Sequence, residues 1–246
     1  GIESRHADLR EWIEVVRKYR EPKRRVRIGV VGKYMDLNDS YRSVWEALSH
    51  GGIANEAAVD AVKIDSGKLE AEGADMVQVF AEVDGILVPG GYGQRGSGGM
   101  VKAVRYAREN KVPYFGICLG MQMMGIEWAR DVLKWEAADS TERNQDSANG
   151  VISLLEDQVD VKSYGGTQRL GKSETALKKG TLIHKIYGAD SIWERHRHRY
   201  EVSNAYRADH PWGLGVQCHP EFKSRPVQPA PLFKSFVGAC VKHAES

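Results

Sequence analysis

The stretch that decides the fold is residues 112–125, which read VPYFGICLGMQMMG. The apolar run from Val112 to Ile117 predicts a buried strand, and the apolar-rich segment from Leu119 to Val132 predicts a helix. Cys118 lies between them, and glycines at positions 116 and 120 flank it. Such glycines relieve crowding at a sharp strand-to-helix turn, which is the layout of a nucleophile elbow.

Cys118 therefore lies at the start of the expected helix. The free N–H groups and the dipole of a helix N-terminus favour negative charge on the sulfur. The backbone N–H of Leu119 lies where an oxyanion would form when the sulfur attacks a carbonyl. A buried structural cysteine is the alternative, but it gives no reason for glycines on both sides. We interpret Cys118 as a nucleophile.

Strand and helix patterns alternate along the chain around this stretch. We expect strands at 26–31, 58–64, 83–88 and 112–117, and helices at 40–50, 100–109 and 119–132, with Gly51-Gly52 ending the first helix. After residue 134 we expect a loop at 138–150, short strands at 159–164, 174–177, 192–203 and 213–218, and a last helix at 231–243. The alternation predicts an α/β fold. Its mostly parallel central sheet has helices on both faces, and extra short strands lie in the C-terminal half.

The N-terminal region precedes the first expected strand and is organised differently. Residues 2–20 carry apolar side chains at helical spacing with charges between them, and Pro22 follows. We therefore divide the chain into a connector helix, residues 1–25, and one domain, residues 26–246. The helix either leads to a further part of the protein or docks on the surface of this domain.

Composition excludes several classes of protein. The 246 residues include 35 basic and 33 acidic side chains, far from the basic excess of a dedicated nucleic-acid binder. No apolar run approaches the roughly 18 residues of a membrane-spanning helix, and the charged N-terminus does not resemble a signal peptide. Three cysteines are too few for a disulfide framework. We expect a cytoplasmic protein with no membrane or nucleic-acid partner.

A thiolate that transfers acyl groups needs a proton shuttle, usually a histidine held by a third group. His219 is the best candidate because it follows the apolar run 213–217, so it would lie at the carboxyl end of a strand. Glu221 lies two residues further on and could fix the orientation of the imidazole. Cys218 would point to the opposite side, where we expect it to pack. Cys118, His219 and Glu221 thus form a candidate triad.

Two other glycine motifs resemble nucleotide-binding loops. Residues 166–173 match the phosphate-binding pattern G-x-x-x-x-G-K-[ST], but the segment after them is too short for the long helix that such a loop opens. Residues 91–96 match G-x-G-x-x-G, but no acidic residue ends the next strand, where a dinucleotide ribose would need one. We favour turns for both, and at residues 91–96 a loop that presents backbone N–H groups.

The run ERHRHRYE at residues 194–201 allows two further interpretations. Its basic and aromatic residues could bind nucleic acid, and His196 and His198 could share a strand face and hold a metal ion. One short basic run in a nearly neutral chain is weak support for nucleic-acid binding. No further cysteine or histidine set at zinc spacing accompanies the two histidines, which argues against a metal site. We expect no metal site and instead expect an arginine of this run to bind a carboxylate or phosphate.

The motifs together resemble those of class I glutamine amidotransferases, the family with a catalytic triad. The resemblance rests on GICLGMQ at 116–122, PGGYG at 89–93 and HPE at 219–221. Closer still, the chain resembles the C-terminal glutaminase domain of CTP synthases, through VGKY at 31–34, GGTQRLG at 165–171 and RHRHRYEV at 195–202. The resemblance implies a flavodoxin-like sheet.

The resemblance also implies roles for individual residues. Cys118 would attack the side-chain amide of glutamine and form a γ-glutamyl thioester, while His219 moves the protons and Glu221 orients it. The N–H groups of Gly91 and Leu119 would form the oxyanion hole. Further residues would hold the substrate: Gly91, Tyr92, Leu119, Gln122, Glu142, Arg199 and Tyr200. Among these, Glu142 suits the α-ammonium group and Arg199 the α-carboxylate.

The same resemblance sets expectations for the whole protein. Proteins of this family carry an N-terminal synthetase domain that converts UTP to CTP with ATP and Mg²⁺. The full-length proteins are activated by GTP and form homotetramers. The glutaminase domain itself would need no cofactor. Between Tyr206 and His210 the chain is shorter than the family pattern by a few tens of residues.

We therefore expect a glutaminase that supplies ammonia to a synthetase domain. Two alternatives remain. The first is a stand-alone cysteine hydrolase acting on γ-glutamyl compounds. The second is a non-catalytic regulatory module of the same fold.

Overall fold

The computed structural model describes residues 7–37, 39–141, 149–154, 169–198, 200–202 and 212–246. Its centre is a five-stranded sheet in the order β10-β4-β3-β1-β2, with every neighbouring pair parallel. The strands are β1 (Arg24–Gly32), β2 (Ala57–Asp65), β3 (Gly85–Val88), β4 (Tyr114–Ile117) and β10 (Gly213–Val216). This is the flavodoxin-like order, and it confirms the expected fold class.

Helices cover both faces of this sheet. The core divides into two clusters of buried side chains, one receiving residues from α2 (Arg42–Ala54) and α8 (Pro231–Ala244). The other receives residues from α3 (Ser66–Glu70), α4 (Met76–Phe80), α5 (Ser97–Asn110) and α6 (Leu119–Glu127). A π-helical turn, Trp128–Val132, extends α6 to the end expected from the sequence.

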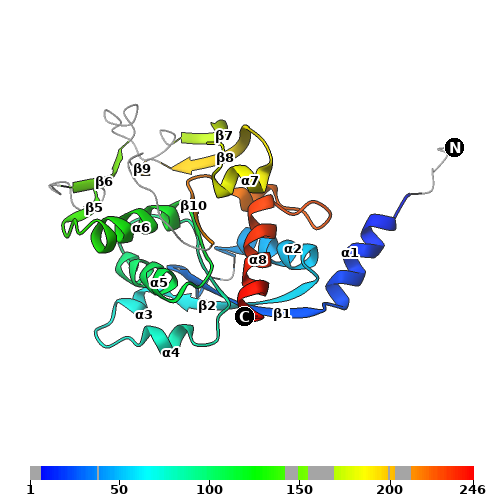
Figure 1. The fold of residues 1–246 in the computed structure, drawn as a ribbon, viewed down its shortest axis with the longest axis horizontal. Helices are drawn as coiled ribbons and strands as arrows, with labels where there is room; N and C mark the ends of the chain where they lie inside the picture. Colours follow the sequence, from blue (N-terminus) through cyan, green and yellow to red (C-terminus); the bar gives the residue numbers. More distant parts are fainter. Residues whose placement is uncertain (1–6, 38, 142–148, 155–168, 199, 203–211) are drawn as a thin grey trace.

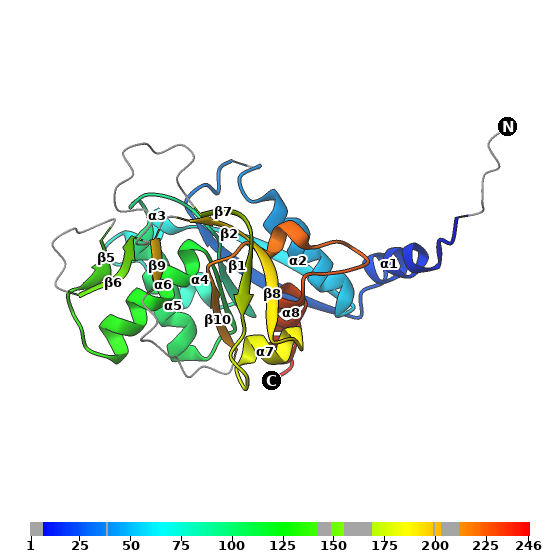
Figure 2. The same ribbon diagram turned by 90° about the horizontal axis from the view of Figure 1, so that it is seen from above.

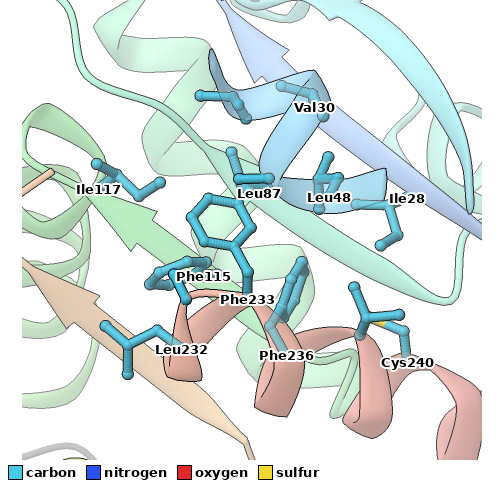
Figure 3. Close-up of a cluster of buried hydrophobic side chains, with 14 of the residues drawn as sticks. Ile28, Val30, Leu48, Leu87, Phe115, Ile117, Leu232, Phe233, Phe236 and Cys240 are labelled. Atoms are coloured by element: carbon cyan, nitrogen blue, oxygen red, sulfur yellow. The ribbon is translucent and has the colours of Figure 1, made fainter. Parts of the chain in front are cut away.

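Aromatic packing holds α8 against the sheet. The ring of Phe115 on β4 meets the rings of Phe233 and Phe236 at centroid distances of 5.3 and 5.6 Å (Figure 3). Trp212 closes the group, 5.9 Å from Phe115 and edge-on to it. The edge-to-face pairs of Phe115 with Phe233 and Trp212 add stabilisation beyond the burial of their surface. The last helix is thereby fixed across β4, the strand that leads to Cys118.

The C-terminal half adds short strands, as expected. β5 (Ala138–Ser140), β6 (Asn149–Leu154) and β9 (Tyr200–Val202) form one sheet, and β7 (Arg169–Ala176) pairs antiparallel with β8 (Ser191–His198). Helix α7 (Leu182–Tyr187) connects β7 to β8. The prediction of a loop over 138–150 is wrong at both ends. Its first residues form β5 and its last residues begin β6, and these two strands pair with each other. The strand expected at 159–164 lies outside the described residues.

Helix α1 (Arg10–Arg20) projects from the rest of the molecule (Figures 1 and 2). It begins later than the expected residue 2, and residues 7–9 are not helical. None of its side chains is buried, and Arg17 reaches Glu56 at 3.7 Å. The domain boundary at residue 25 stays a prediction. Among the described helices, none has the length and apolar character needed to cross a membrane.

The expectation that Gly51-Gly52 ends a helix is wrong. Helix α2 continues through both glycines to Ala54, and both are buried. A Cβ on Gly51 would lie 2.8 Å from the carbonyl oxygen of Phe233 on α8, and one on Gly52 would lie 2.6 Å from that of Ala57. The glycines therefore let two neighbouring backbones approach α2 closely, and they do not terminate it.

This packing predicts the effect of Gly51→Ala. Alanine favours a helix, but here its Cβ would strike a fixed backbone oxygen, so we expect a loss of about 1–3 kcal/mol in the free energy of unfolding. Gly98→Ala in α5 is the matched control, because its Cβ would meet only the Glu70 side chain, whose carboxylate can move. Urea unfolding of both variants measures the difference. Equal stability of the two variants would contradict the packing argument.

Candidate active site

Cys118 lies in a sharp, strained turn between β4 and α6. Its backbone has φ 52° and ψ −102°, a conformation that residues other than glycine rarely adopt. A Cβ on Gly116 would lie 2.6 Å from the carbonyl carbon of Gly120, and one on Gly120 would collide with the carbonyl group of Val88. Both flanking positions therefore require glycine, as the sequence indicates. Strain of about 1–3 kcal/mol at one buried cysteine points to a functional constraint.

His219 and Glu221 lie together beside this turn. Nδ1 of His219 is 2.7 Å from Oε1 of Glu221, and both side chains are buried. A Cβ on Gly90 would lie 2.9 Å from Cε1 of His219 and 3.5 Å from Cβ of Cys118, so the imidazole and the cysteine border the same small space. Within the described residues, Nε2 of His219 has no hydrogen-bond partner. The geometry therefore leaves Nε2 to exchange a proton with a group in that space.

The charge state of His219 follows from its neighbours. Burial by itself lowers the pKa of the imidazole, because a charge is disfavoured away from water. Interaction with Cys118 and with the carboxylate of Glu221 outweighs burial and raises the pKa to about 10. The imidazole therefore carries a proton near neutral pH and can act as a proton donor.

The loop after β3 brings Gly91 to the same place. A Cβ on Gly91 would lie 3.3 Å from Cδ2 of Leu119, so the loop packs directly on the first residue of α6. Lys33 is 2% exposed, and its Nζ donates to the carbonyl oxygens of Tyr92, at 3.2 Å, and Gly93. Arg95 in turn donates to the carbonyl of Lys33. The turn after β1 thus fastens the loop that carries Gly91.

Strand β8 contacts both the sulfur of Cys118 and the loop that follows β3. The thiol of Cys118 donates to the carbonyl of Arg197 at 3.8 Å, and the hydroxyl of Tyr92 donates to the same carbonyl at 3.3 Å. The guanidinium of Arg197 lies over the ring of Tyr92, 5.8 Å from its centroid. Tyr92 is nevertheless exposed. It forms an outer wall between the loop and β8.

Gln122 connects the first turn of α6 to β9. Its Nε2 donates to the carbonyl of Tyr200 at 3.1 Å and to Oε1 of Gln217 at 3.4 Å. Nε2 of Gln217 then donates to Sγ of Cys118, also at 3.4 Å. Eight of the expected site residues therefore lie around one space or in contact with its walls, and Gln217 joins them. The eight are Gly91, Tyr92, Cys118, Leu119, Gln122, Tyr200, His219 and Glu221. Glu142 and Arg199 lie outside the described residues, as does the segment 206–210.

The competing motifs have other roles in the fold. Residues 169–173 of the phosphate-loop match lie within β7, and the ammonium of Lys172 lies over the ring of Trp193, 5.1 Å from its centroid. Such a strand does not offer the backbone cradle of a phosphate loop. His196 and His198 do share a buried face of β8, with ring nitrogens 3.0 Å apart. Over the described part of the chain, no group of three metal-binding side chains forms.

Comparison with known proteins gives the family. The model for "Glutamine amidotransferase class-I" matches residues 36–239. The chain belongs to the class I glutamine amidotransferases, in the branch formed by the glutaminase domains of CTP synthases. A solved structure described as the glutaminase domain of the Trypanosoma brucei CTPS with bound acivicin is 36% identical. It covers 88% of this chain and 94% of its own, with a TM-score of 0.79.

Curated relatives give the same family. The CTP synthase of Geobacter sulfurreducens is 48% identical over 98% of this chain and 49% of its own length. That of Thermus thermophilus is 44% identical over 100% of this chain and 50% of its own length. The chain thus spans about half the length of the curated relatives that it matches. The first alignment runs over 267 positions, so that relative carries residues with no counterpart among these 246.

Sequence reasoning missed two residues of this glutaminase site. Lys33 belongs to a quoted motif, but only the fold shows that its ammonium reaches the loop after β3. Gln217 lies two residues before His219, and that spacing could have indicated it. Gln217 contacts the sulfur and His219 borders the same space, while Cys218 between them is buried.

Lys33 offers a direct test of the loop. In Lys33→Met the carbonyls of Tyr92 and Gly93 lose their anchor, so we expect kcat for glutamine hydrolysis to fall about 10- to 100-fold, with a smaller change in KM. Lys68→Met removes an exposed lysine and is the control. Steady-state assays of ammonia release measure the effect. If both variants match the unmodified protein, Lys33 does not position the loop.

The raised pKa of His219 predicts a dependence of stability on pH. The folded protein holds this proton up to about pH 10, while the unfolded chain releases it near pH 6.5. The stabilisation is therefore complete below pH 6.5 and is lost as pH rises to about 10, by an amount on the order of a few kcal/mol. Urea unfolding between pH 6 and 10 should show a steeper decline for the unmodified protein than for His219→Gln. Parallel declines would contradict the raised pKa.

Proposed function

We propose that this domain hydrolyses the side-chain amide of L-glutamine to glutamate and ammonia, with Cys118 as the nucleophile. One observation carries the proposal: a strained cysteine, locked between two glycines, borders the same space as a buried His219–Glu221 pair. A structural cysteine would need neither the strain nor the buried charge. The arrangement suits a thiol that attacks a carbonyl and a histidine that moves its protons.

In the reactive form the thiol proton of Cys118 has passed to His219, and the first step forms a bond from the thiolate Sγ of Cys118 to the carbonyl carbon of the glutamine side chain. The electron pair of the carbonyl moves to its oxygen, and the backbone N–H groups of Gly91 and Leu119 stabilise that oxyanion. The packing of Gly91 on Leu119 supports this role, because two donors must lie within reach of one oxygen. The anchoring by Lys33 keeps the loop from moving as charge develops.

The proton transfers belong to His219. It donates the proton of Nε2 to the departing nitrogen, the C–N bond breaks, and ammonia leaves behind a γ-glutamyl thioester. His219 then takes a proton from water, the water oxygen attacks the thioester carbon, and the C–S bond breaks to release glutamate. Glu221 accepts from Nδ1 throughout, which holds the ring and stabilises its charged form. The raised pKa of His219 supports its role as the acid of the first half-reaction.

Substrate binding involves groups that lie beside the triad. We infer that Gln122, Tyr92 and the backbone at Tyr200 contact the amino-acid end of glutamine, with Glu142 on its α-ammonium group and Arg199 on its α-carboxylate. The contact of Gln122 with Tyr200 supports a shared surface for this end. The exposure of Tyr92 supports a place at the mouth of the site.

We also propose that the ammonia serves a synthetase domain of the same polypeptide, which forms CTP from UTP. The relatives carry the name CTP synthase and are about twice as long as this chain, which supports the proposal. ATP, Mg²⁺ and the activator GTP would act with that synthetase part, in a cytoplasmic homotetramer. The glutaminase chemistry of the described site uses amino-acid side chains and backbone groups alone.

Labelling with 6-diazo-5-oxo-L-norleucine, an electrophile shaped like glutamine, tests the function. We expect one adduct per chain, on Cys118 by peptide mass spectrometry, slowed by added L-glutamine and absent in Cys118→Ala. Cys218 and Cys240 are buried free thiols and serve as internal controls. Hydrolysis by Cys118→Ala should fall about 1000-fold or more. Labelling chiefly at Cys218 or Cys240 would falsify the proposal, and a preference for other γ-glutamyl compounds would identify the stand-alone hydrolase instead.

A further inference from the structure

The side-chain amide of Gln217 contacts the sulfur of Cys118. Nε2 of Gln217 donates to Sγ at 3.4 Å, from the segment between β10 and the short helical turn that carries Glu221. This contact stands apart from the triad, because it involves neither His219 nor the oxyanion loop. It places an uncharged N–H group directly on the atom that we propose to be the nucleophile.

A second hydrogen bond fixes the orientation of that amide. Gln122 donates from its own Nε2 to Oε1 of Gln217 at 3.4 Å and to the carbonyl of Tyr200 at 3.1 Å. An amide oxygen accepts and an amide nitrogen donates. Because Oε1 of Gln217 is taken by a donor, its Nε2 is the end that faces the sulfur. The chain of contacts runs from β9 through two amides to Cys118.

A backbone hydrogen bond joins the turn at Cys118 to the strand that precedes Gln217. The N–H of Cys118 donates to the carbonyl of Val216 at 2.7 Å, which holds the strained turn against the end of β10. Beyond Val216, Gln217 contacts the sulfur and His219 borders the same space, while Cys218 between them is buried. One short segment therefore places both the donating amide of Gln217 and the imidazole of His219 beside the cysteine.

The two donors differ in what they can do. His219 must give its proton to the leaving group and later recover one, so it is not a constant donor to the sulfur. The amide of Gln217 keeps its hydrogens throughout the cycle. A hydrogen bond to a charged atom is stronger than one to a neutral atom, so this donor favours the thiolate over the thiol. It acts both before attack and when the sulfur departs from the thioester.

We propose that Gln217 is a further catalytic residue of this domain. Its side-chain N–H stabilises the negative charge on Sγ of Cys118, and Gln122 holds it in the donating orientation. The inference rests on the proposed role of Cys118 as the nucleophile. It adds a group outside the triad whose removal should change the reactivity of the sulfur itself.

Two substitutions test the role on the full chain. Gln217→Met keeps a side chain of similar length but removes the donor, and Gln217→Glu keeps the shape but turns an ionised carboxylate toward the sulfur. Gln78→Met, on the exposed surface of α4, is the matched control. For each variant we would measure kcat and KM for glutamine, the thermal midpoint of unfolding, and the rate of Cys118 alkylation by iodoacetamide from pH 5 to 10. Iodoacetamide is small and needs no glutamine pocket.

We expect kcat to fall about 10- to 100-fold in Gln217→Met and further in Gln217→Glu, with KM within about threefold. The alkylation profile should move to higher pH by about one unit in Gln217→Met and by more in Gln217→Glu, while Gln78→Met matches the unmodified protein. An unchanged alkylation profile overturns the inference. A lower thermal midpoint with an unchanged profile also overturns it, because a purely structural role would give that result. Failure of the proposed function is distinct, since it would appear as absence of glutamine-analogue labelling in the unmodified protein.

Discussion

The rest of the structure depends on the close approach of three backbone segments at Cys118. The end of β3, the end of β4 and the first turn of α6 meet so tightly that a single added carbon at Gly116 or Gly120 would enter a neighbouring backbone group. That approach forces the cysteine into a left-handed conformation. The strain is sustained because the surrounding core is close-packed and offers no room to relax. The sulfur consequently lies at the carboxyl edge of the sheet, where the segments after β1, β3 and β10 begin.

Charge around the sulfur is balanced by groups of different kinds. His219 and Glu221 are a buried pair, and burial of either alone would be costly. Lys33 is buried as well, but its ammonium is satisfied by backbone carbonyls and holds a loop in place. Gln217 supplies a donor without charge. A site of this kind can carry a negative sulfur, a developing oxyanion and a protonated imidazole within a small volume.

The sequence predicted those elements whose signal is local. The strand-turn-helix around Cys118 was evident because apolar runs and flanking glycines are contiguous, and the alternation of elements predicted the parallel sheet. A local signal also produced the wrong helix end at residues 51–52, because glycine commonly ends helices. These two glycines are instead required by the close approach of α8 and β2, which a local pattern does not reveal. The strand Ala138–Ser140 was missed because it is only 3 residues long and is defined by its pairing with β6. Three short helices, α3, α4 and α7, are too brief to show a helical period.

The sequence by itself determined the chemistry of the site: a cysteine at an elbow, a histidine and glutamate two residues apart after a strand, and a glycine-rich loop. These are properties of neighbouring residues, so no fold is needed to see them. Only the tertiary structure decided which groups support them. The ammonium of Lys33 acts 59 and 60 residues away along the chain, and the amide of Gln217 acts 99 residues away. Contacts at such separations are set by the order of strands in the sheet, because parallel strands bring their carboxyl ends to one edge whatever their distance in sequence.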